Sequence, residues 1–417
     1  MATIIPFKAI RPTIDKVGLV ASRSVDGYNL NELKDKLEAN PFSFLHVINP
    51  DFSDGIRTKP GSVERLKKVK NKFKEFISDE VFIQDETPCY YVYRQIKEKN
   101  TFVGIIACSS IEDYINGTIK IHEQTLTHRE QKLMEYVKVC EFNAEPVLFS
   151  YPDDTDINNF CSETCKQRPE YDFTTTDRIR HSLWVVKDTD KVNFIKGRFE
   201  SVKAIYIADG HHRSASSTLL GVEKRKQNPN FIGNESYNFY LGVFFPESQL
   251  KIYDYNRVIK DLNGLSVDEL LQKIKHHFEI EIINDEFFVP QKKHQLSMFV
   301  NNTWYCLTAH TNVYNSNDPV GSLDAQILTE TILTPILDIK DLKTDKRVGF
   351  VPGVKGAKTL KKLVTDGKFS VAFGLYPVTL EHLKWIADTN KIMPPKSTWV
   401  EPKMRSGLLV YSIEENK

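Results

Sequence analysis

The chain has 417 residues, of which 41% are hydrophobic and 27% charged, and its formal net charge is +1 at pH 7. This composition excludes long disordered regions, collagen-like repeats and coiled coils, and the length allows two domains or one large one. The near-neutral charge argues against a nucleic-acid partner, and the lack of a signal peptide or of any apolar run near ~18 residues predicts a cytoplasmic protein without a membrane partner.

The first hundred residues predict short strands and loops with two helices. Apolar runs at 4–14 and 40–50 are interrupted by proline, which indicates strands and connecting loops. Residues 28–40 predict a helix capped by Asn29 or Asn31. An amphipathic helix is expected at 61–77, and its apolar positions, Leu66, Val69, Phe73 and Phe76, recur at helical spacing.

Strands and helices continue to alternate further along the chain. Two strands are expected at 89–96 and 101–111, joined by a turn, and a helix at 125–139, where Thr127 and Glu130 match a capping box. Further strands are expected at 143–151, 181–188 and 204–210. This alternation predicts a mixed α/β (α+β) fold, with one domain at 1–250 and a C-terminal α+β domain at 251–417.

One segment, IADGHHRSAS at residues 207–216, concentrates polar groups where a strand ends and a helix begins. The N-terminus of a helix attracts anions through its unpaired N–H groups and its dipole. His211, His212 and Arg213 add donors that suit phosphate oxygens, and Gly210 lets the backbone turn or approach the anion. Ser214 is a candidate cap, and Asp209 a candidate to orient a histidine, hold a metal ion or act as a base. A zinc site at His211 and His212 is disfavoured, because neighbouring residues on a helix point in different directions, and the metal ligands stay unknown.

A second polar group, Lys120, His122 and Glu123, precedes the helix expected at 125–139. If residues 120 and 122 belong to one strand, Lys120 and His122 face the same side and meet a phosphate there. Glu123 at the strand end is the candidate general base for a substrate hydroxyl, and a structural or metal-bound carboxylate is the alternative.

A third polar group lies near the C-terminus, in MPPKSTWVEPKMRSGL at residues 393–408. Prolines and a glycine constrain this loop, and its basic and hydroxyl side chains suit an anionic or amino-acid substrate: Lys396, Ser397, Thr398, Lys403, Arg405 and Ser406. An incidental surface connection is the equal alternative on composition alone. Arg257, beside apolar residues, is expected to form a structural ion pair.

The chain resembles the family known as domain of unknown function 1015 in six segments: 6–12, 40–50, 119–125, 207–216, 254–262 and 393–408. The strand-DGHHR-helix segment also resembles the ParB/sulfiredoxin-like nucleotide-binding fold, whose members include kinases of free L-serine. One segment departs from the family pattern: VASRSVDGYN at 20–29 keeps Asp26 but lacks the prolines of the usual Pro-Pro-Tyr-Asp-Val-like run. Substrate preference or loop shape is therefore expected to differ there.

The resemblance implies a kinase that transfers a phosphoryl group from ATP or ADP to free L-serine with Mg²⁺, and a homodimer is left open. Residues 209–213 would hold the phosphates, Glu123 or Asp209 would accept the hydroxyl proton, and Lys120 or Lys403 would offset developing charge. The alternative is a nucleotide-binding regulator without phosphotransfer. A reductase of the sulfiredoxin type is disfavoured, because residues 207–216 contain no cysteine.

Overall fold

The computed structural model describes residues 1–414, and of Asp26, Ser53 and Asp54 the backbone alone. It contains two compact units. The first comprises 1–121, 125–250 and the chain from Pro402 onward, and the second comprises His122–Gln124 and Lys251–Glu401. The chain therefore enters the second unit at Lys251 and returns to the first at Pro402.

The first unit is built on a nine-stranded mixed sheet with the order β6-β11-β8-β12-β5-β4-β10-β9, and β1 pairs with β5 beside this row. Two of its strand pairs, β6–β11 and β8–β12, are parallel, whereas the others are antiparallel. The predicted mixed α/β fold is confirmed. The strands are β1 (Ile4–Ile5), β4 (Tyr90–Lys97), β5 (Asn100–Ser110), β6 (Ile119–Lys120), β8 (Val147–Tyr151), β9 (Tyr171–Thr174), β10 (Ile179–Val186), β11 (Ile205–Asp209) and β12 (Phe239–Pro246).

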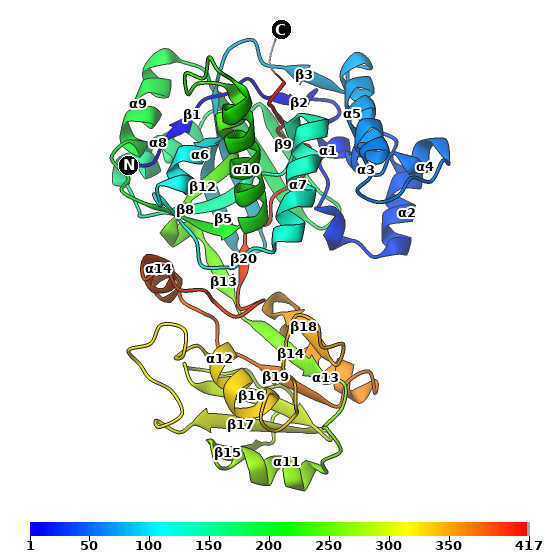
Figure 1. The fold of residues 1–417 in the computed structure, drawn as a ribbon, viewed down its shortest axis with the longest axis vertical. Coiled ribbons are helices and arrows are strands. Elements are labelled where there is room, and N and C mark those ends of the chain that lie inside the picture. Colours follow the sequence, from blue (N-terminus) through cyan, green and yellow to red (C-terminus); the bar gives the residue numbers. More distant parts are fainter. Residues whose placement is uncertain (415–417) are drawn as a thin grey trace. The chain divides into compact units, whose positions relative to one another are not determined.

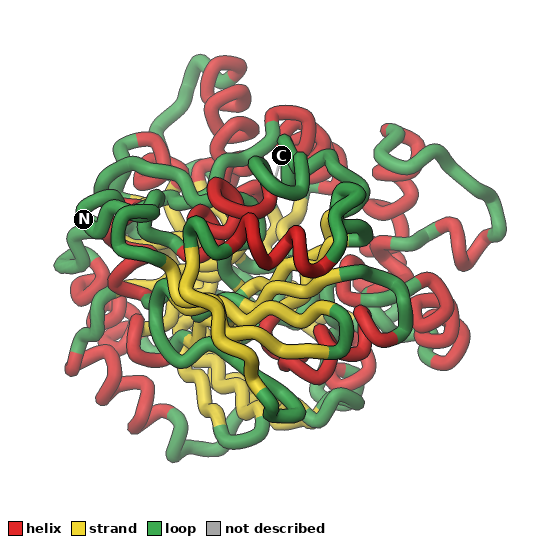
Figure 2. The backbone as a smooth tube through the Cα atoms, turned by 90° about the horizontal axis from the view of Figure 1, so that it is seen from below, coloured by secondary structure: helices red, strands yellow, loops and turns green. Residues whose placement is uncertain are grey.

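The central strands are apolar on both faces because helices cover the sheet. Ile105, Phe149, Ile207 and Phe244 belong to one buried cluster, in which the rings of Phe149 and Phe244 stack with their centroids 4.9 Å apart. Figure 1 shows α10 (His211–Gln227) and α7 (Thr127–Cys140) side by side on this sheet, where the two helices pack against each other. Figure 2 shows the strands in yellow and the helices in red.

The other helices of the first unit are α1 (Val17–Val20), α2 (Leu30–Ala39), α3 (Leu45–Ile48), α4 (Asp51–Asp54), α5 (Val63–Ser78), α6 (Ile111–Ile115), α8 (Thr155–Thr164) and α9 (Thr189–Phe199). Two of them confirm the sequence predictions. Asn29 caps α2 by accepting a hydrogen bond from the Glu32 amide, and α5 buries the predicted apolar stripe. Two two-stranded antiparallel ladders complete this unit: β2 (Ile10–Pro12) with β3 (Phe82–Gln84), and β7 (Phe142–Asn143) with β21 (Tyr411–Ser412).

Two local predictions in this unit are wrong. Residues 40–50 were expected to form strand and loop, but they contain α3, since Phe44 and Val47 pack with Leu66 of α5 in one buried cluster. The predicted capping box of α7 is absent, because the helix already begins at Thr127 and its N-cap is Leu126. Glu130 instead accepts a hydrogen bond from the Thr125 hydroxyl.

The second unit contains a six-stranded antiparallel sheet with the order β15-β17-β16-β19-β14-β18 and a two-stranded ladder, β13–β20. Helix α12 continues as a π-helical turn (Thr329–Leu333) that ends before Pro335. The elements are β13 (Lys251–Tyr253), β14 (Tyr255–Ile259), β15 (Phe278–Ile283), β16 (Gln295–Val300), β17 (Thr303–Ala309), β18 (Val348–Pro352), β19 (Val371–Gly374), β20 (Trp399–Glu401), α11 (Val267–Ile274), α12 (Asp324–Leu328), α13 (Gly356–Thr365) and α14 (Leu380–Asp388). Within the described residues of the whole chain, none of the helices has the length and apolar character to cross a membrane.

Candidate functional site

The histidine corner, residues 209–213, lies where β11 passes directly into α10. Ile205 and Ile207 are fully buried, so β11 is fixed in the sheet up to its last residue, Asp209. Gly210 is the N-cap of α10 and has φ = 105° and ψ = 29°, a conformation that favours glycine. A Cβ at this position would lie 3.0–3.1 Å from the guanidinium of Arg213. Glycine therefore allows the turn, as the sequence suggested, and also the close approach of Arg213.

Arg213 lies between two carboxylates without a close ion pair to either. Its Nη2 is 3.9 Å from Oδ1 of Asp209, and its Nη1 is 4.0 Å from Oε2 of Glu145. Its one hydrogen bond among the described residues runs from Nη1 to the carbonyl oxygen of Pro146, at 2.5 Å. Since a guanidinium carries five N–H donors, most of the donors of Arg213 remain available to a ligand.

Asp209 has its closest partner far along the sequence. Lys403 donates from Nζ to Oδ2 of Asp209 at 2.7 Å. Burial alone would raise the pKa of Asp209, but the positive charges of Lys403 and Arg213 outweigh it and lower the pKa to about 2. Asp209 is therefore a carboxylate at every physiological pH.

The other residues of the corner differ in exposure. His211 is buried and His212 is half-buried. Ser214 is fully buried, and its Oγ lies 2.6 Å from the hydroxyl of Tyr240. The prediction that Ser214 caps the helix is wrong, because α10 starts three residues earlier, at His211, and Ser214 belongs to its first turn.

The second predicted group does not form a continuous strand. β6 ends at Lys120, which pairs with Tyr206 of β11, so Lys120 lies beside the strand that leads to the corner. His122 and Glu123 lie beyond the strand and belong to the second unit. The prediction that Lys120 and His122 share one strand face is wrong, since the ladder with β11 covers two residues only. The backbone carbonyl of His122 accepts a hydrogen bond from the Met393 amide at 2.9 Å.

The predicted substrate loop is divided between the units. Lys403 belongs to the first unit and pairs with Asp209, whereas Lys396, Ser397 and Thr398 belong to the second. Ser397 is buried and donates to the Pro394 carbonyl at 2.8 Å, and Thr398 is half-buried. Lys396 is exposed and has a positive φ of 57°.

Arg257 holds this loop instead of forming the expected ion pair. It is fully buried and donates to the carbonyl oxygens of Lys396 at 2.9 Å and Pro395 at 3.2 Å. No carboxylate pairs with it among the described residues, and burial lowers its pKa to about 10. The ion-pair prediction is therefore wrong, because backbone oxygens supply the negative partial charge that a carboxylate was expected to supply.

One residue near the corner, Glu145, was missed by sequence reasoning. Glu145 flanks Arg213 and accepts a hydrogen bond from the Ser406 hydroxyl at 2.6 Å. A carboxylate directly before an apolar strand was the one signal available for Glu145. Ser406 belongs to the predicted polar group at 393–408, but it lies 261 residues from Glu145 in the sequence, so nothing local relates the two residues.

The described residues contain no cluster of three or more His, Cys, Asp or Glu side chains that could hold a metal ion. A protein-only metal site at the corner is therefore not formed. The residues fit Mg²⁺ only as a phosphate-bound ion, since Mg²⁺ commonly takes one or two carboxylates together with substrate phosphates and water. Asp209 is the ionised carboxylate that suits this arrangement.

Residues 4–326 match the family described as protein of unknown function DUF1015. The chain belongs to this family. The matched range contains the histidine corner, Lys120, His122 and Glu123, and it ends before the segment 393–408. For that segment the family resemblance stays a prediction.

Comparison with other proteins gives weak similarities to solved structures. A variant of free serine kinase in complex with ADP shares 11% identity over 75% of this DUF1015 chain and 94% of that chain, with a TM-score of 0.38. SbnI from Staphylococcus aureus, truncated at its C-terminus, shares 11% over 73% and 85%, with a TM-score of 0.36. A conserved hypothetical protein from Pyrococcus furiosus shares 12% over 76% and 97%, with a TM-score of 0.36. Similarity at this level does not carry a function from one protein to another. No curated protein matches the chain. The resemblance to the ParB/sulfiredoxin-like fold stays a prediction.

Proposed function

We propose that this DUF1015 protein is a kinase that transfers a phosphoryl group from ATP or ADP to the hydroxyl of free L-serine. The observation that carries the proposal is the state of Arg213, whose guanidinium lies at the N-terminus of α10 with most of its N–H donors unused. Helix N-termini and guanidinium groups both favour phosphate oxygens. The choice of L-serine rests on the sequence resemblance alone.

In this proposal the corner neutralises and orients phosphates, because phosphoryl transfer depends mainly on positioning and charge stabilisation. Arg213, His212 and the first amides of α10 contact the phosphates. Mg²⁺, when bound, neutralises charge on the transferred group, and Asp209 is its candidate protein ligand. Lys403, which pairs with Asp209 at 2.7 Å, offsets charge that develops on the phosphoryl oxygens.

Asp209 is a poor candidate for the base that accepts the proton of the serine hydroxyl. A general base works best when its pKa is near the working pH. The pKa of Asp209 is lowered to about 2, so its carboxylate is a weak proton acceptor. Glu123 stays the alternative base that the sequence predicts.

The test is phosphorus NMR of the purified protein with Mg²⁺, ATP or ADP, and free L-serine. A phosphomonoester signal that requires serine supports the kinase. Nucleotide binding by calorimetry without any phosphoester would contradict it and favour a nucleotide-binding regulator.

The matched variants are Arg213→Ala and Arg225→Ala, on the same helix. Arg225 lies in the last turn of α10, where it pairs with Glu112. Loss of charged hydrogen bonds to phosphate predicts that Arg213→Ala weakens nucleotide binding about tenfold or more. Arg225→Ala should bind nucleotide as the unmodified protein does, and equal affinities for all three proteins would reject the corner as the phosphate site.

A further inference from the structure

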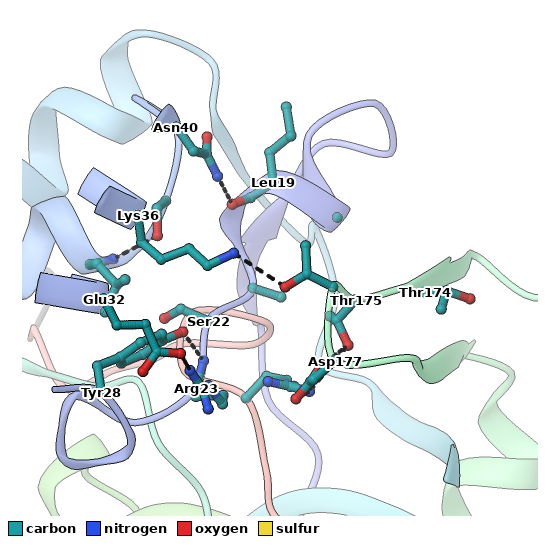
Figure 3. A pocket seen from close by; sticks show the side chains of 16 residues that line it. Leu19, Ser22, Arg23, Tyr28, Glu32, Lys36, Asn40, Thr174, Thr175 and Asp177 are labelled. Atoms are coloured by element: carbon teal, nitrogen blue, oxygen red, sulfur yellow. Dashed lines mark hydrogen bonds and ion pairs between the residues drawn. The ribbon is translucent and has the colours of Figure 1, made fainter. Parts of the chain in front are cut away.

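The first unit contains a polar pocket of about 300 Å³ that no step above uses, here named the Ser22 pocket. Segment 18–28, helix α2, the residues after β9 and Arg405 contribute to its lining. Lys36 donates from Nζ to Oγ1 of Thr176 at 3.2 Å, and Figure 3 shows its side chain extending from α2. The volume is at the lower end of the range for small-molecule sites. A ligand in this pocket is therefore small.

The charges of the lining favour a ligand with one anionic group. Three cationic side chains, Arg23, Lys36 and Arg405, and two carboxylates, Glu32 and Asp177, give the pocket a net charge of +1. Arg23 pairs with Glu32, and Arg405 pairs with Asp177. Lys36 has no carboxylate partner among the described residues, so its charge is the one left for a ligand.

Buried donors without acceptors also point to a ligand. Ser22 is 5% exposed and lines the pocket, and its Oγ has no hydrogen-bond partner within the described part of the chain. An unmet buried hydroxyl costs free energy that a ligand recovers. Arg405 uses Nε and Nη2 for protein contacts, whereas Nη1 has no acceptor in the described residues.

Arg405 is held in place from behind by a buried chain of hydrogen bonds. Its Nε donates to Nε2 of His181 at 3.3 Å. Nε2 of His181 therefore carries no proton. Neutral His181 then carries its proton on Nδ1, which lies 2.6 Å from the Tyr93 hydroxyl, and that hydroxyl donates to Gln95 at 3.0 Å. A guanidinium fixed in this way presents its remaining N–H groups in a defined direction.

We propose that the Ser22 pocket binds a small α-amino acid, with its carboxylate on Lys36, Nη1 of Arg405 and Oγ of Ser22. The carboxylates of Glu32 and Asp177 then face the ammonium group of the ligand. A phosphate dianion fits less well, because it would meet these two carboxylates in the same pocket. This inference rests on the proposed function in its choice of L-serine as the first ligand.

The pocket and the histidine corner share one segment, 403–406. Lys403 pairs with Asp209 of the corner, and Arg405 pairs with Asp177 of the pocket. Ser406 bonds Glu145, which flanks Arg213, and its backbone pairs with Ser22. An amino acid in the Ser22 pocket thus contacts the same short segment that holds the corner.

The segment that departs from the family pattern, 20–29, lies in this lining. Ser22, Arg23 and Tyr28 all come from it, and the Arg23 guanidinium lies 4.2 Å from the centroid of the Tyr28 ring. Because these residues line the pocket directly, they explain why a departure from the family pattern at this segment is expected to change substrate preference.

The experiment is calorimetry of the full chain with L-serine, without nucleotide, followed by the other common amino acids, ethanolamine and inorganic phosphate. Saturable binding of L-serine or another α-amino acid supports the proposal, provided that ethanolamine, which lacks the carboxylate, binds at least about tenfold more weakly. Absence of binding by every amino acid, or tighter binding of ethanolamine or phosphate, would overturn it.

Two variants on α2 give a matched comparison. Lys36→Met should weaken amino-acid binding about tenfold, because it removes a charged hydrogen bond. Lys34→Met removes the same charge from the exposed face of the helix, where Lys34 pairs with Glu38, and should leave affinity unchanged. Ser22→Ala, which removes a single buried oxygen, should also weaken binding. Equal affinity in all three variants would reject the site.

The proposed amino-acid site and the proposed kinase activity can be rejected independently of each other. Serine binding that depends on Lys36, in a protein that forms no phosphoserine, keeps the pocket and rejects the kinase. Phosphoserine formed by Lys36→Met with an unchanged KM for serine keeps the kinase and rejects the pocket.

Discussion

Arg213 at the histidine corner and Arg405 in the Ser22 pocket each lie near carboxylates, but the protein holds them differently. The Arg213 guanidinium is 3.9 Å and 4.0 Å from its two carboxylates, and among the described residues it makes one hydrogen bond, to a backbone carbonyl. The side chain of Arg405 is 5% exposed, and its Nη2 lies 2.8 Å from both carboxylate oxygens of Asp177. One guanidinium is loosely placed and the other is fixed.

The difference indicates two tasks for the same functional group. A loosely held guanidinium keeps its donors for a ligand that brings several negative charges, as a nucleotide does. A fixed guanidinium offers fewer donors but defines their direction, which suits orientation of a small ligand. Binding at the corner should then depend on charge, and binding in the pocket on geometry.

The largest expected effect comes from removal of the fixed arginine. Arg405→Ala should lower the free energy of unfolding by about 3 kcal/mol, because it leaves Asp177 and buried His181 without their partner. Arg213→Ala should cost less than about 1 kcal/mol, since its charge contacts are long and partly exposed. Urea unfolding of both variants measures the difference, and equal losses would contradict the contrast between the two sites.

The two sites should also respond differently to pH. Burial, with the charge of Arg405, lowers the pKa of His181 to about 3, although Asp177 acts in the opposite direction. The folded state therefore keeps His181 neutral while the unfolded state takes up a proton below its ordinary pKa of 6.5. Stability should fall as the pH drops below that value, by at most about 1.4 kcal/mol per pH unit.

The histidine corner should not contribute to this loss of stability below pH 6.5. Asp209 has a folded pKa of about 2, against an ordinary value of 3.8, so its stabilisation is complete above 3.8 and is lost only as the pH falls toward 2. Urea unfolding of His181→Gln and of the unmodified protein at about pH 7 and about pH 5 tests this. Between these two pH values the free energy of unfolding of His181→Gln should fall by about 2 kcal/mol less than that of the unmodified protein. His276→Gln, at an exposed position, is the control, and an unchanged slope in His181→Gln would contradict this origin of the pH dependence.

The histidine corner could be predicted because its signals are local. A buried apolar run, Asp-Gly and a helix-forming run follow one another within residues 204–220, so the strand, the turn and the helix N-terminus were all visible. The failures at Thr127 and Ser214 are of one kind. Each residue type caps helices well, but the helix starts at Thr127 itself in α7 and before Ser214 in α10.

The remaining contacts are set by the tertiary structure. Asp209 and Lys403 are 194 residues apart, and Arg405 and Asp177 are 228 apart, so no window of the sequence relates them. The return of the chain to the first unit at Pro402 creates both pairs. Arg257 shows a further limit, since a buried arginine predicts a partner but does not tell a carboxylate from backbone carbonyls.

The smallest expected effect, that of Gly210→Ala, tests how loosely Arg213 is held at the histidine corner. Gly210→Ala places a Cβ in a backbone with φ = 105° and within 3.0–3.1 Å of the Arg213 guanidinium. Gly264→Ala is the matched control, because Gly264 also has a positive φ, of 76°, but no atom within 4 Å of its Cβ position. Both should lose about 1 kcal/mol of stability from the strained backbone.

Only Gly210→Ala should also lose nucleotide affinity, because Arg213 must move away from the helix N-terminus to admit the methyl group. If Arg213 is as loosely held as its distances indicate, it moves at little further cost in stability. Gly210→Ala and Gly264→Ala then differ far more in affinity for ADP than in free energy of unfolding. Calorimetry with ADP and urea unfolding on the same samples separate the two quantities. A much larger loss of stability in Gly210→Ala would mean that Arg213 is fixed like Arg405, and the contrast between corner and pocket would then be lost.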